Sequence, residues 1–194
     1  MEMTTPDASI FANEPIRRMT RAEYHRLGEA GFFGEEKVEL LFGVVVEMTP
    51  IDQAHIHSTY LVRRLLERAL GDRATVYSPS VFGASDISEP EPDLMVVPSS
   101  AEPWDEHPSS ADLVVEIARS SLARDQRIKA LLYGLSDVEE YWIVNHVDEV
   151  VEVHRDRDAG VWRTKAVHGR GERVAMLRFP DVEIAVSDIL PPRP

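Results

Sequence analysis

The sequence predicts a mixed α/β domain, in which a central β-sheet containing both hairpins and helix-linked strands is flanked by helices. Two nearly continuous apolar runs, Pro92–Val97 and Asp112–Ala118, are typical of strands that are buried on both faces. A third observation is an apolar stripe with i, i+3, i+4, i+7 spacing, which predicts a helix directly after the second run: Ile128, Leu131, Leu132 and Leu135. Ser120 or Ser121 would cap that helix.

The N-terminal part predicts a short helix, a hairpin and a long helix. Thr20 and Glu23 form a capping-box signature that opens a helix through about Ala30. Residues 37–48 predict a hairpin around Phe42 and Gly43. Residues 54–71 then predict an amphipathic helix with Gly71 as its C-cap. The expected core stripe of that helix is Tyr60, Leu61, Leu65 and Leu66.

The remaining elements follow from strand and turn signals. Residues 74–85 predict a strand before the first apolar run, and residues 99–111 predict a loop between the two runs. Residues 140–155 predict a hairpin that turns near His146–Asp148. The C-terminal residues 161–169 and 173–179 predict one or two edge strands.

Length and composition predict one domain, residues 19–194, preceded by an arm of residues 1–18. The 194 residues are 43% hydrophobic and 28% charged, which is ordinary for a globular protein. There is no apolar run long enough to cross a membrane and no secretory signal pattern, so we expect no membrane association and a cytoplasmic protein. The absence of cysteine excludes disulfides and thiolate metal sites.

The net charge of −13 argues against passive adhesion to nucleic acid or to an anionic membrane. The charges are unevenly distributed, because residues 74–118 contain no lysine or arginine and several acidic residues. Four basic residues follow directly: Arg119, Arg124, Arg127 and Lys129. A segment that attracts cations therefore precedes a small one that attracts anions. For a charge run alone, a solvated loop followed by an ordinary helix surface is the favoured interpretation.

Glu116 is out of place in its apolar run. An ionised carboxylate in a buried strand costs several kcal/mol unless a cation or a set of donors compensates it. Asp93 begins the other apolar run, so two neighbouring strands would each carry a carboxylate. Like charges this close require something positive between them, and a divalent metal or Lys129 are the candidates.

These residues resemble the PD-(D/E)XK nuclease superfamily, which has a Pro-Asp opening one strand, a Glu in the next and a nearby Lys. The usual lysine two residues after the glutamate is replaced here by Ala118. In this departure the sequence resembles the Uma-two family of restriction-endonuclease-like proteins, in which the lysine lies in the following helix. The similarity runs from about Thr20 to about Arg155 and includes "EPDLMVV", "DLVVEIARSS" and "RDQRIKALLYGLSDVEEYWIV".

The resemblance implies a restriction-endonuclease-like mixed sheet flanked by helices and a metal-dependent endonuclease that hydrolyses the phosphodiester bonds of DNA. Asp93 and Glu116 would hold Mg²⁺ (or Mn²⁺), and Lys129 would assist the attacking water. Glu39 matches the acidic residue of the first superfamily motif and joins the catalytic set. His55 matches a histidine ahead of the second helix, and it and Arg124 would bind substrate. A homodimer is also expected, since such nucleases often act as dimers and the C-terminal strands need covering.

Other interpretations stay open at the level of sequence. Lys129 lies four residues after Asp125, so the two could form a surface ion pair. Glu39 alone would more often be a solvent-facing strand residue, and His55 a capping or surface group. A catalytically degenerate nuclease fold that acts as a binding or regulatory module is the alternative function. Hydrolysis of a small phosphoester would use the same site. Ser120 and Ser121 lack the partners of a serine hydrolase.

Overall fold

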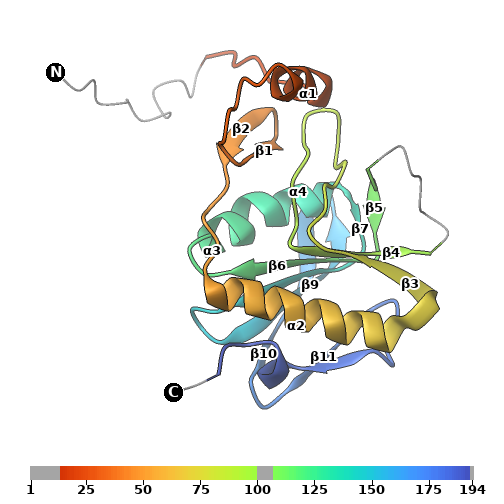
Figure 1. Ribbon diagram of the computed structural model, residues 1–194. Helices are drawn as coiled ribbons and strands as arrows, with labels where there is room; N and C mark the ends of the chain where they lie inside the picture. Colours follow the sequence, from red (N-terminus) through yellow and green to blue (C-terminus); the bar gives the residue numbers. More distant parts are fainter. Residues whose placement is uncertain (1–13, 100–106, 193–194) are drawn as a thin grey trace.

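The structure, a computed structural model, describes residues 14–99 and 107–192. A six-stranded mixed sheet forms its centre, with helix α2 on one face and helix α4 on the other (Figure 1). The sheet has the order β10–β9–β8–β6–β4–β3, built from Val161–Gly169, Val150–Asp158, Tyr141–Asn145, Leu113–Ala118, Leu94–Pro98 and Ala74–Tyr77. Strands β6 and β8 are parallel and the other neighbours are antiparallel. The predicted mixed α/β fold is therefore confirmed.

The remaining elements surround this sheet. The helical segments are α1 (Arg21–Glu29), α2 (Gln53–Leu70), a 3₁₀ turn (Gly71–Arg73), α3 (Leu122–Arg124), a π-helix (Asp125–Lys129), α4 (Ala130–Leu135) and a second 3₁₀ turn (Val186–Asp188). Three small two-stranded sheets pair β1 (Val38–Leu41) with β2 (Val44–Glu47), β5 (Ser110–Ala111) with β7 (Asp137–Val138), and β11 (Arg173–Ala175) with β12 (Glu183–Ala185).

Helix α1 and the β1–β2 hairpin lie together at one end of the molecule (Figure 1). Thr20 caps α1 through the predicted capping box with Glu23. Phe42 and Gly43 form the predicted hairpin turn, with φ of 51° and 74°. Positive φ at both central positions matches the strand twist of a two-residue hairpin. Both predictions for this end of the chain are thus confirmed.

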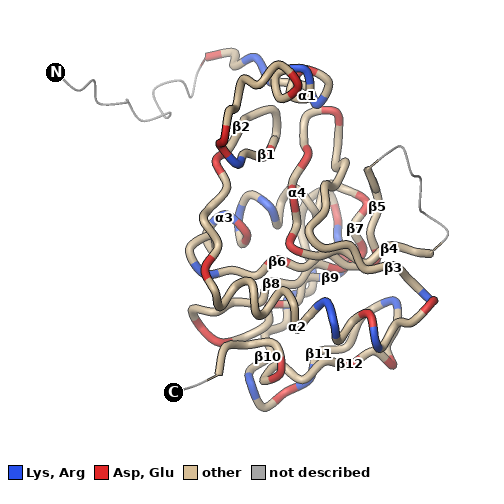
Figure 2. Tube along the Cα trace, viewed as in Figure 1, with Lys and Arg blue, Asp and Glu red and all other residues tan. Residues whose placement is uncertain are grey.

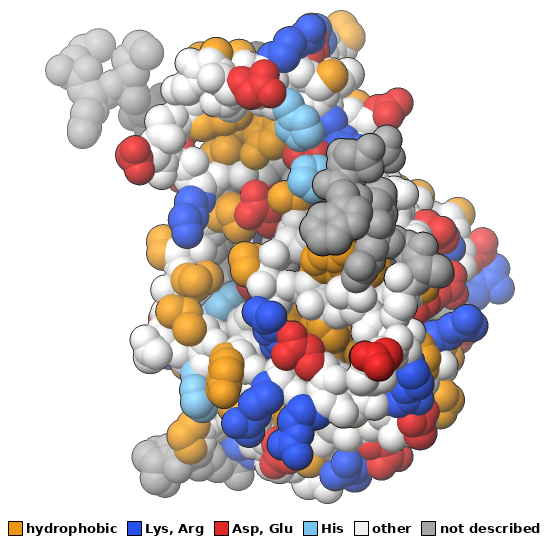
Figure 3. Space-filling view, turned by 45° about the vertical axis from the view of Figure 1, so that its right-hand side comes forward, with side chains coloured by type: hydrophobic (Ala, Val, Ile, Leu, Met, Phe, Trp, Pro, Cys, Tyr) orange, Lys and Arg blue, Asp and Glu red, His pale blue; other side chains and the backbone are white. Residues whose placement is uncertain are grey.

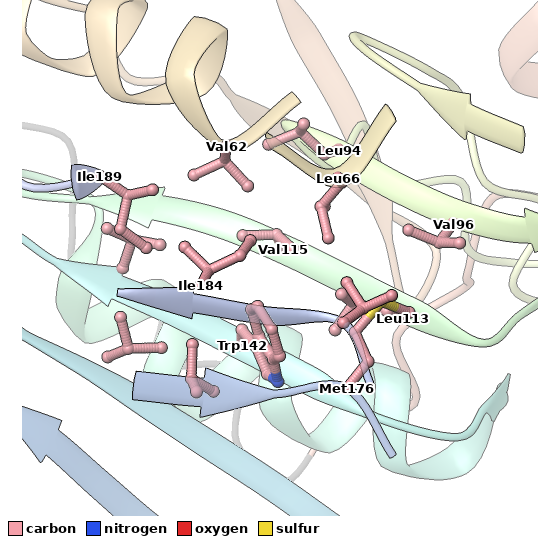
Figure 4. Packing of buried hydrophobic residues seen from close by; sticks show 14 of the residues in the cluster. Val62, Leu66, Leu94, Val96, Leu113, Val115, Trp142, Met176, Ile184 and Ile189 are labelled. Carbon is pink, nitrogen blue, oxygen red and sulfur yellow. The ribbon is translucent and has the colours of Figure 1, made fainter. Parts of the chain in front are cut away.

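Helix α2 packs on one face of the sheet, and its C-cap is Gly71 as predicted. Its buried apolar side chains are Val62, Leu66 and Leu70, which contact strand residues such as Leu94 and Val115 (Figure 4). The predicted stripe was wrong in phase. Tyr60 is exposed, Leu61 and Leu65 are only partly buried, and Leu66 alone belongs to the fully buried set. The buried stripe, Val62, Leu66 and Leu70, has the spacing i, i+4, i+8. Which face of the helix is buried depends on how the helix docks on the sheet.

The segment after β6 differs most from its prediction. Leu132 is buried, but Ile128, Leu131 and Leu135 are exposed, so the predicted stripe was wrong. The face that packs on the sheet contains other residues: Asp125, Lys129, Ala130, Leu132, Tyr133 and Gly134. The helix turns this face inward because the polar side chains of Asp125 and Lys129 belong to the buried site described below. Ser121 occupies the N-cap position of α3, but neither it nor Ser120 makes the predicted side-chain cap bond.

The C-terminal half confirms the predicted hairpin as β8–β9, with its turn after Asn145. Strand β10 is the predicted edge strand of the main sheet. Residues 173–175 instead pair with β12 in a separate sheet that contributes Val174 and Ile184 to the core under α2. In the predicted strand of residues 74–85, only Ala74–Tyr77 are extended in the sheet.

Two predictions fall partly outside the described residues. These are the loop of residues 99–111, of which residues 100–106 are not described, and the arm of residues 1–18. Residues 14–18 of the arm are exposed and form no helix or strand. In the described part of the chain, every helix is too short or too polar to cross a membrane.

The hairpin turn offers a test of how β1 is held. Gly43 has a φ of 74°, and a Cβ there would lie 2.4 Å from Cβ of Arg18. We expect Gly43→Ala to lower the free energy of unfolding by about 2–4 kcal/mol, because backbone strain and steric overlap both act there. Gly31→Ala is the matched control, since its φ is also 74° but no atom lies within 4 Å of the added Cβ. Urea denaturation measures both, and equal losses would contradict the steric argument.

Candidate active site

Glu116 lies in the middle of β6 on the face that α4 covers. Its strand neighbours Val114 and Ala118 belong to the core on that face, and side chains alternate along a strand. Strands β4 and β6 pair Leu94 with Val115, which brings Asp93, at the start of β4, beside Glu116. The prediction that these residues lie on adjacent strands is confirmed. Glu116 is only 4% exposed, so its charge requires a partner.

Lys129 supplies that partner. Its Nζ lies 2.8 Å from Glu116 Oε1 and 3.2 Å from Glu39 Oε2. All three side chains are buried, so this ammonium links β6 to β1 through the interior of the protein. Burial lowers the pKa of Lys129, but the charges of Glu116 and Glu39 outweigh this effect and raise it. Lys129 therefore stays protonated. The surface ion pair that its spacing from Asp125 allowed is absent among the described residues.

Glu116 accepts a second hydrogen bond, from the hydroxyl of Tyr133 at 2.8 Å. Both donors reach Oε1, and within the described residues Oε2 accepts none. Burial raises the pKa of Glu116 well above its usual range, Lys129 opposes that shift, and the neighbouring acids add to it. The strand tolerates Glu116 because one of its oxygens has two donors.

Asp93 is held from two sides. Its Oδ1 lies 2.7 Å from His55 Nε2, and its Oδ2 accepts a 2.7 Å bond from the backbone N–H of Ile117. His55 lies near the start of α2, where Asp52 is the N-cap. Burial lowers the pKa of His55, but the hydrogen bond and charge of Asp93 outweigh burial and raise it. His55 thus positions the Asp93 carboxylate, which is more than the surface role left open for it.

Glu39 and Arg124 complete the set that the sequence identified. Glu39 on β1 is buried, accepts a 3.3 Å bond from the backbone N–H of Glu91, and lies 3.4 Å from Nη1 of Arg124. It is therefore not the solvent-facing residue that its strand alone would suggest. One pocket is lined by all six nominated side chains: Glu39, His55, Asp93, Glu116, Arg124 and Lys129.

Several polar residues of the pocket were missed from the sequence. Asp125 is 2% exposed, and its Oδ2 has no hydrogen-bond partner among the described residues. Burial raises the pKa of Asp125 to about 6. Tyr133, which donates to Glu116 but does not line the pocket, was not singled out from the sequence. Asp52 and Arg119 form a 2.8 Å ion pair that also lines the pocket. Asp125 left a signal as an acid four residues before Lys129, a spacing that is common on helix surfaces. Arg119 left one as the first member of the basic run after residue 118.

The pocket carries an excess of negative charge. Six acidic side chains line it, namely Glu39, Asp52, Glu91, Asp93, Glu116 and Asp125, against three basic ones, Arg119, Arg124 and Lys129. With all acids ionised and His55 neutral, the excess is three negative charges. On the face drawn in Figure 3 and along the trace in Figure 2, basic and acidic positions are interspersed. A phosphate group would meet repulsion in this pocket unless a further cation were present.

The carboxylates of the pocket suit a hard cation that takes only one or two ligands from the protein. Within residues 14–99 and 107–192, no three His, Cys, Asp or Glu side chains form a group that could hold a metal ion. A complete protein cage of the kind that binds Ca²⁺ or structural Zn²⁺ therefore does not fit. Mg²⁺ keeps several waters and takes only one or two carboxylates. The neighbouring carboxylates of Asp93 and Glu116, with the unbonded Oε2 of Glu116, fit that requirement.

Comparison with known proteins was decisive for the family. Residues 21–187 match the family Uma2, described as "Putative restriction endonuclease". The chain belongs to the Uma2 family. This match spans α1, both faces of the sheet and every residue of the pocket, and it confirms the resemblance inferred from the sequence.

A solved structure supports the fold. It is described as a "putative nuclease belonging to DUF820 from Anabaena variabilis", and it is similar to this chain with a TM-score of 0.70 and 17% sequence identity. The similarity covers 90% of this chain and 97% of that chain. At this identity the similarity concerns the fold. No curated protein matches the chain.

The buried ammonium can be tested by a double-mutant cycle. Lys129→Met leaves Glu116 and Glu39 without their shared cation, so we expect it to lower the free energy of unfolding by about 3–5 kcal/mol at neutral pH. Glu116→Gln should cost less, about 1–3 kcal/mol, because Lys129 keeps Glu39. We expect the double variant to be about 1–3 kcal/mol more stable than the sum of the single losses predicts. Urea unfolding of the four proteins without divalent metal measures this, and strict additivity would contradict the pairing.

Proposed function

We propose that this protein is a metal-dependent endonuclease that hydrolyses phosphodiester bonds of DNA in the pocket between β1, β4, β6 and the π-helix. The observation that carries the proposal is the pair of carboxylates on adjacent buried strands, Asp93 and Glu116, beside a lysine that stays charged. A domain that needed only stability would gain by replacing such buried charges with apolar residues of similar size. Membership of the Uma2 family supports the same reaction class.

Asp93 and Glu116 would hold the metal, Mg²⁺ or Mn²⁺. The bound cation would neutralise charge on the phosphoryl oxygens and lower the pKa of a water molecule. His55 and the N–H of Ile117 fix the Asp93 carboxylate, and Tyr133 and Lys129 fix that of Glu116. Two ligands are thus held in place before the cation arrives, which reduces the reorganisation that binding requires.

Lys129 would act as a hydrogen-bond donor and a fixed positive charge. An ammonium group has three N–H donors, of which two are directed to Glu116 and Glu39. The third can orient the attacking water or stabilise the charge that builds on the phosphoryl group. Because Lys129 is paired with Glu116 and Glu39, we assign it the role of a donor and not that of a general base.

Arg124 and His55 would bind the substrate at the edge of the same pocket, and Glu39 would fix both basic neighbours. Glu39 contacts the side chains of Lys129 and Arg124 at once, so one carboxylate orients two cations. Arg124 is a quarter exposed and can reach a phosphate from this anchored position. The excess negative charge implies weak DNA affinity without metal, because the metal supplies part of the attraction.

A catalytically degenerate fold that binds a partner is the second candidate, favoured by Ala118 at the position of the usual lysine. Lys129 reaches the same glutamate from the next helix, which weakens that argument. Hydrolysis of a small phosphoester would use the same groups. The reaction assay therefore includes a small phosphodiester beside plasmid and single-stranded DNA.

We expect the purified protein to nick or cut DNA with Mg²⁺ or Mn²⁺ and to be inactive in EDTA. Glu116→Gln should remove the thermal stabilisation by the cation, since a ligand that binds only the native state raises stability by mass action. Lys129→Gln should keep that stabilisation and lose cleavage by about 100-fold or more. Arg63→Gln, at an exposed ion pair on α2, serves as the control that should change neither. The proposal would be refuted if neither metal raised the melting temperature of the wild type and neither led it to cleave DNA.

The homodimer expected from the sequence stays a prediction. Strand β10 forms one edge of the main sheet and exposes Val161 and Val167, so a second copy could cover it. We expect light scattering to give twice the 21.9 kDa mass of the chain at micromolar concentration, and Val167→Lys to shift the protein toward monomer. A 22 kDa species of the wild type would contradict this.

A further inference from the structure

Asp125 is a buried acid that neither the sequence motifs nor the proposed ligand pair uses. It begins the π-helix, lines the pocket together with Asp93 and Glu116, and is 2% exposed. Its Oδ2 has no hydrogen-bond donor among the described residues. Leaving a buried carboxylate oxygen without a donor costs free energy, so stability alone does not explain this residue.

Asp125 and Lys129 lie four residues apart but do not form an ion pair. Lys129, one helical turn later, directs its ammonium to Glu116 and Glu39 instead. The hydroxyl of Tyr141 donates to the backbone carbonyl of Asp125, and the backbone N–H of Asp125 donates to the carbonyl of Ser121. The backbone is thus fixed at a π-helix, a distortion that often marks functional positions.

The carboxylates of Asp93, Glu116 and Glu39 in the same pocket already have partners. Asp93 is bonded through both oxygens, Glu116 through Oε1 to two donors, and Glu39 to Lys129 and Arg124. Lys129 is already paired with Glu116 and Glu39. Glu91 also lines the pocket, but it is half-buried, so solvent can satisfy it. The Oε2 of Glu116, which also accepts no hydrogen bond, is reserved for the proposed metal. An acceptor for a proton inside the pocket is therefore missing from the roles assigned so far, and Asp125 Oδ2 is an unbonded buried oxygen of the pocket that has no role yet.

We propose that Asp125 is a further catalytic residue, whose Oδ2 accepts a hydrogen bond from the attacking water and then takes its proton. This inference rests on the proposed function. In the step, the water O–H bond breaks, its proton passes to Oδ2, and the water oxygen bonds to phosphorus. The bond from phosphorus to the leaving ester oxygen breaks, and that oxygen takes a proton from solvent. Asp125 returns its own proton to solvent afterwards.

The test separates this role from metal binding. Asp125→Asn keeps the shape of the side chain but is a far weaker base, so we expect the single-turnover rate of plasmid cleavage to fall by about 100-fold or more. The affinity for Mn²⁺ in isothermal titration should stay within about threefold of wild type, because Asp93 and Glu116 are intact. Asp112→Asn is the matched control, since Asp112 is also a buried aspartate and does not line the pocket. It should cleave at the wild-type rate.

A second variant guards against misfolding of the first. Asp125→Ala opens a small space, and we expect added formate to restore part of its cleavage rate by supplying a carboxylate there. Wild-type cleavage by Asp125→Asn would overturn the inference and leave the proposed function standing. A tenfold or greater loss of Mn²⁺ affinity would also overturn it, since Asp125 would then act as a ligand. A loss of cleavage in Glu91→Gln but not in Asp125→Asn would assign the base to Glu91. A wild type without metal-dependent cleavage would defeat both.

Discussion

The ammonium of Lys129, buried between Glu116 and Glu39, is the interaction on which the rest of the site depends. It joins three segments that are distant in the chain: the first hairpin, the central strand β6 and the helix that follows it. Its positive charge offsets the repulsion between these two buried carboxylates. It also lines the pocket, so the same group that stabilises the fold presents a positive charge there.

The sequence predicted the fold and the membership of the site better than it predicted which helix faces are buried. Glu116 and Asp93 could be recognised because each interrupts an apolar run, and a charge in a buried strand demands an explanation. The apolar stripe Ile128, Leu131 and Leu135 misled for a related reason. Periodicity assumes that apolar side chains face inward, whereas here the polar side chains of Asp125 and Lys129 take the inward face of the helix.

The residues that sequence analysis missed share a different property. Tyr133 has no distinctive neighbours in the chain, and the spacing of Asp125 from Lys129 is common on helix surfaces, so their importance depends on where the fold places them. The phase of α2 was missed for the same reason, since whether Tyr60 or Val62 faces the sheet depends on the docking of the whole helix (Figure 4). Local patterns fix element type and order, whereas the orientation of an element is settled by tertiary packing.

The hairpin that carries Glu39 lies outside the main sheet. Tyr24 of α1 donates to the carbonyl of Val38, and Leu40 and Glu89 of the loop before β4 exchange backbone hydrogen bonds. Leu41 on β1 is buried in the core, whereas β2 is exposed at both ends and half-buried between them. If this hairpin opened locally, Glu39 would leave Lys129 and Arg124, and the ammonium would face Glu116 alone. The free energy of such an opening would then be set by charge as much as by apolar area. The hairpin and the sheet should consequently exchange their amide hydrogens as one cooperative unit, although β1 shares no ladder with the sheet.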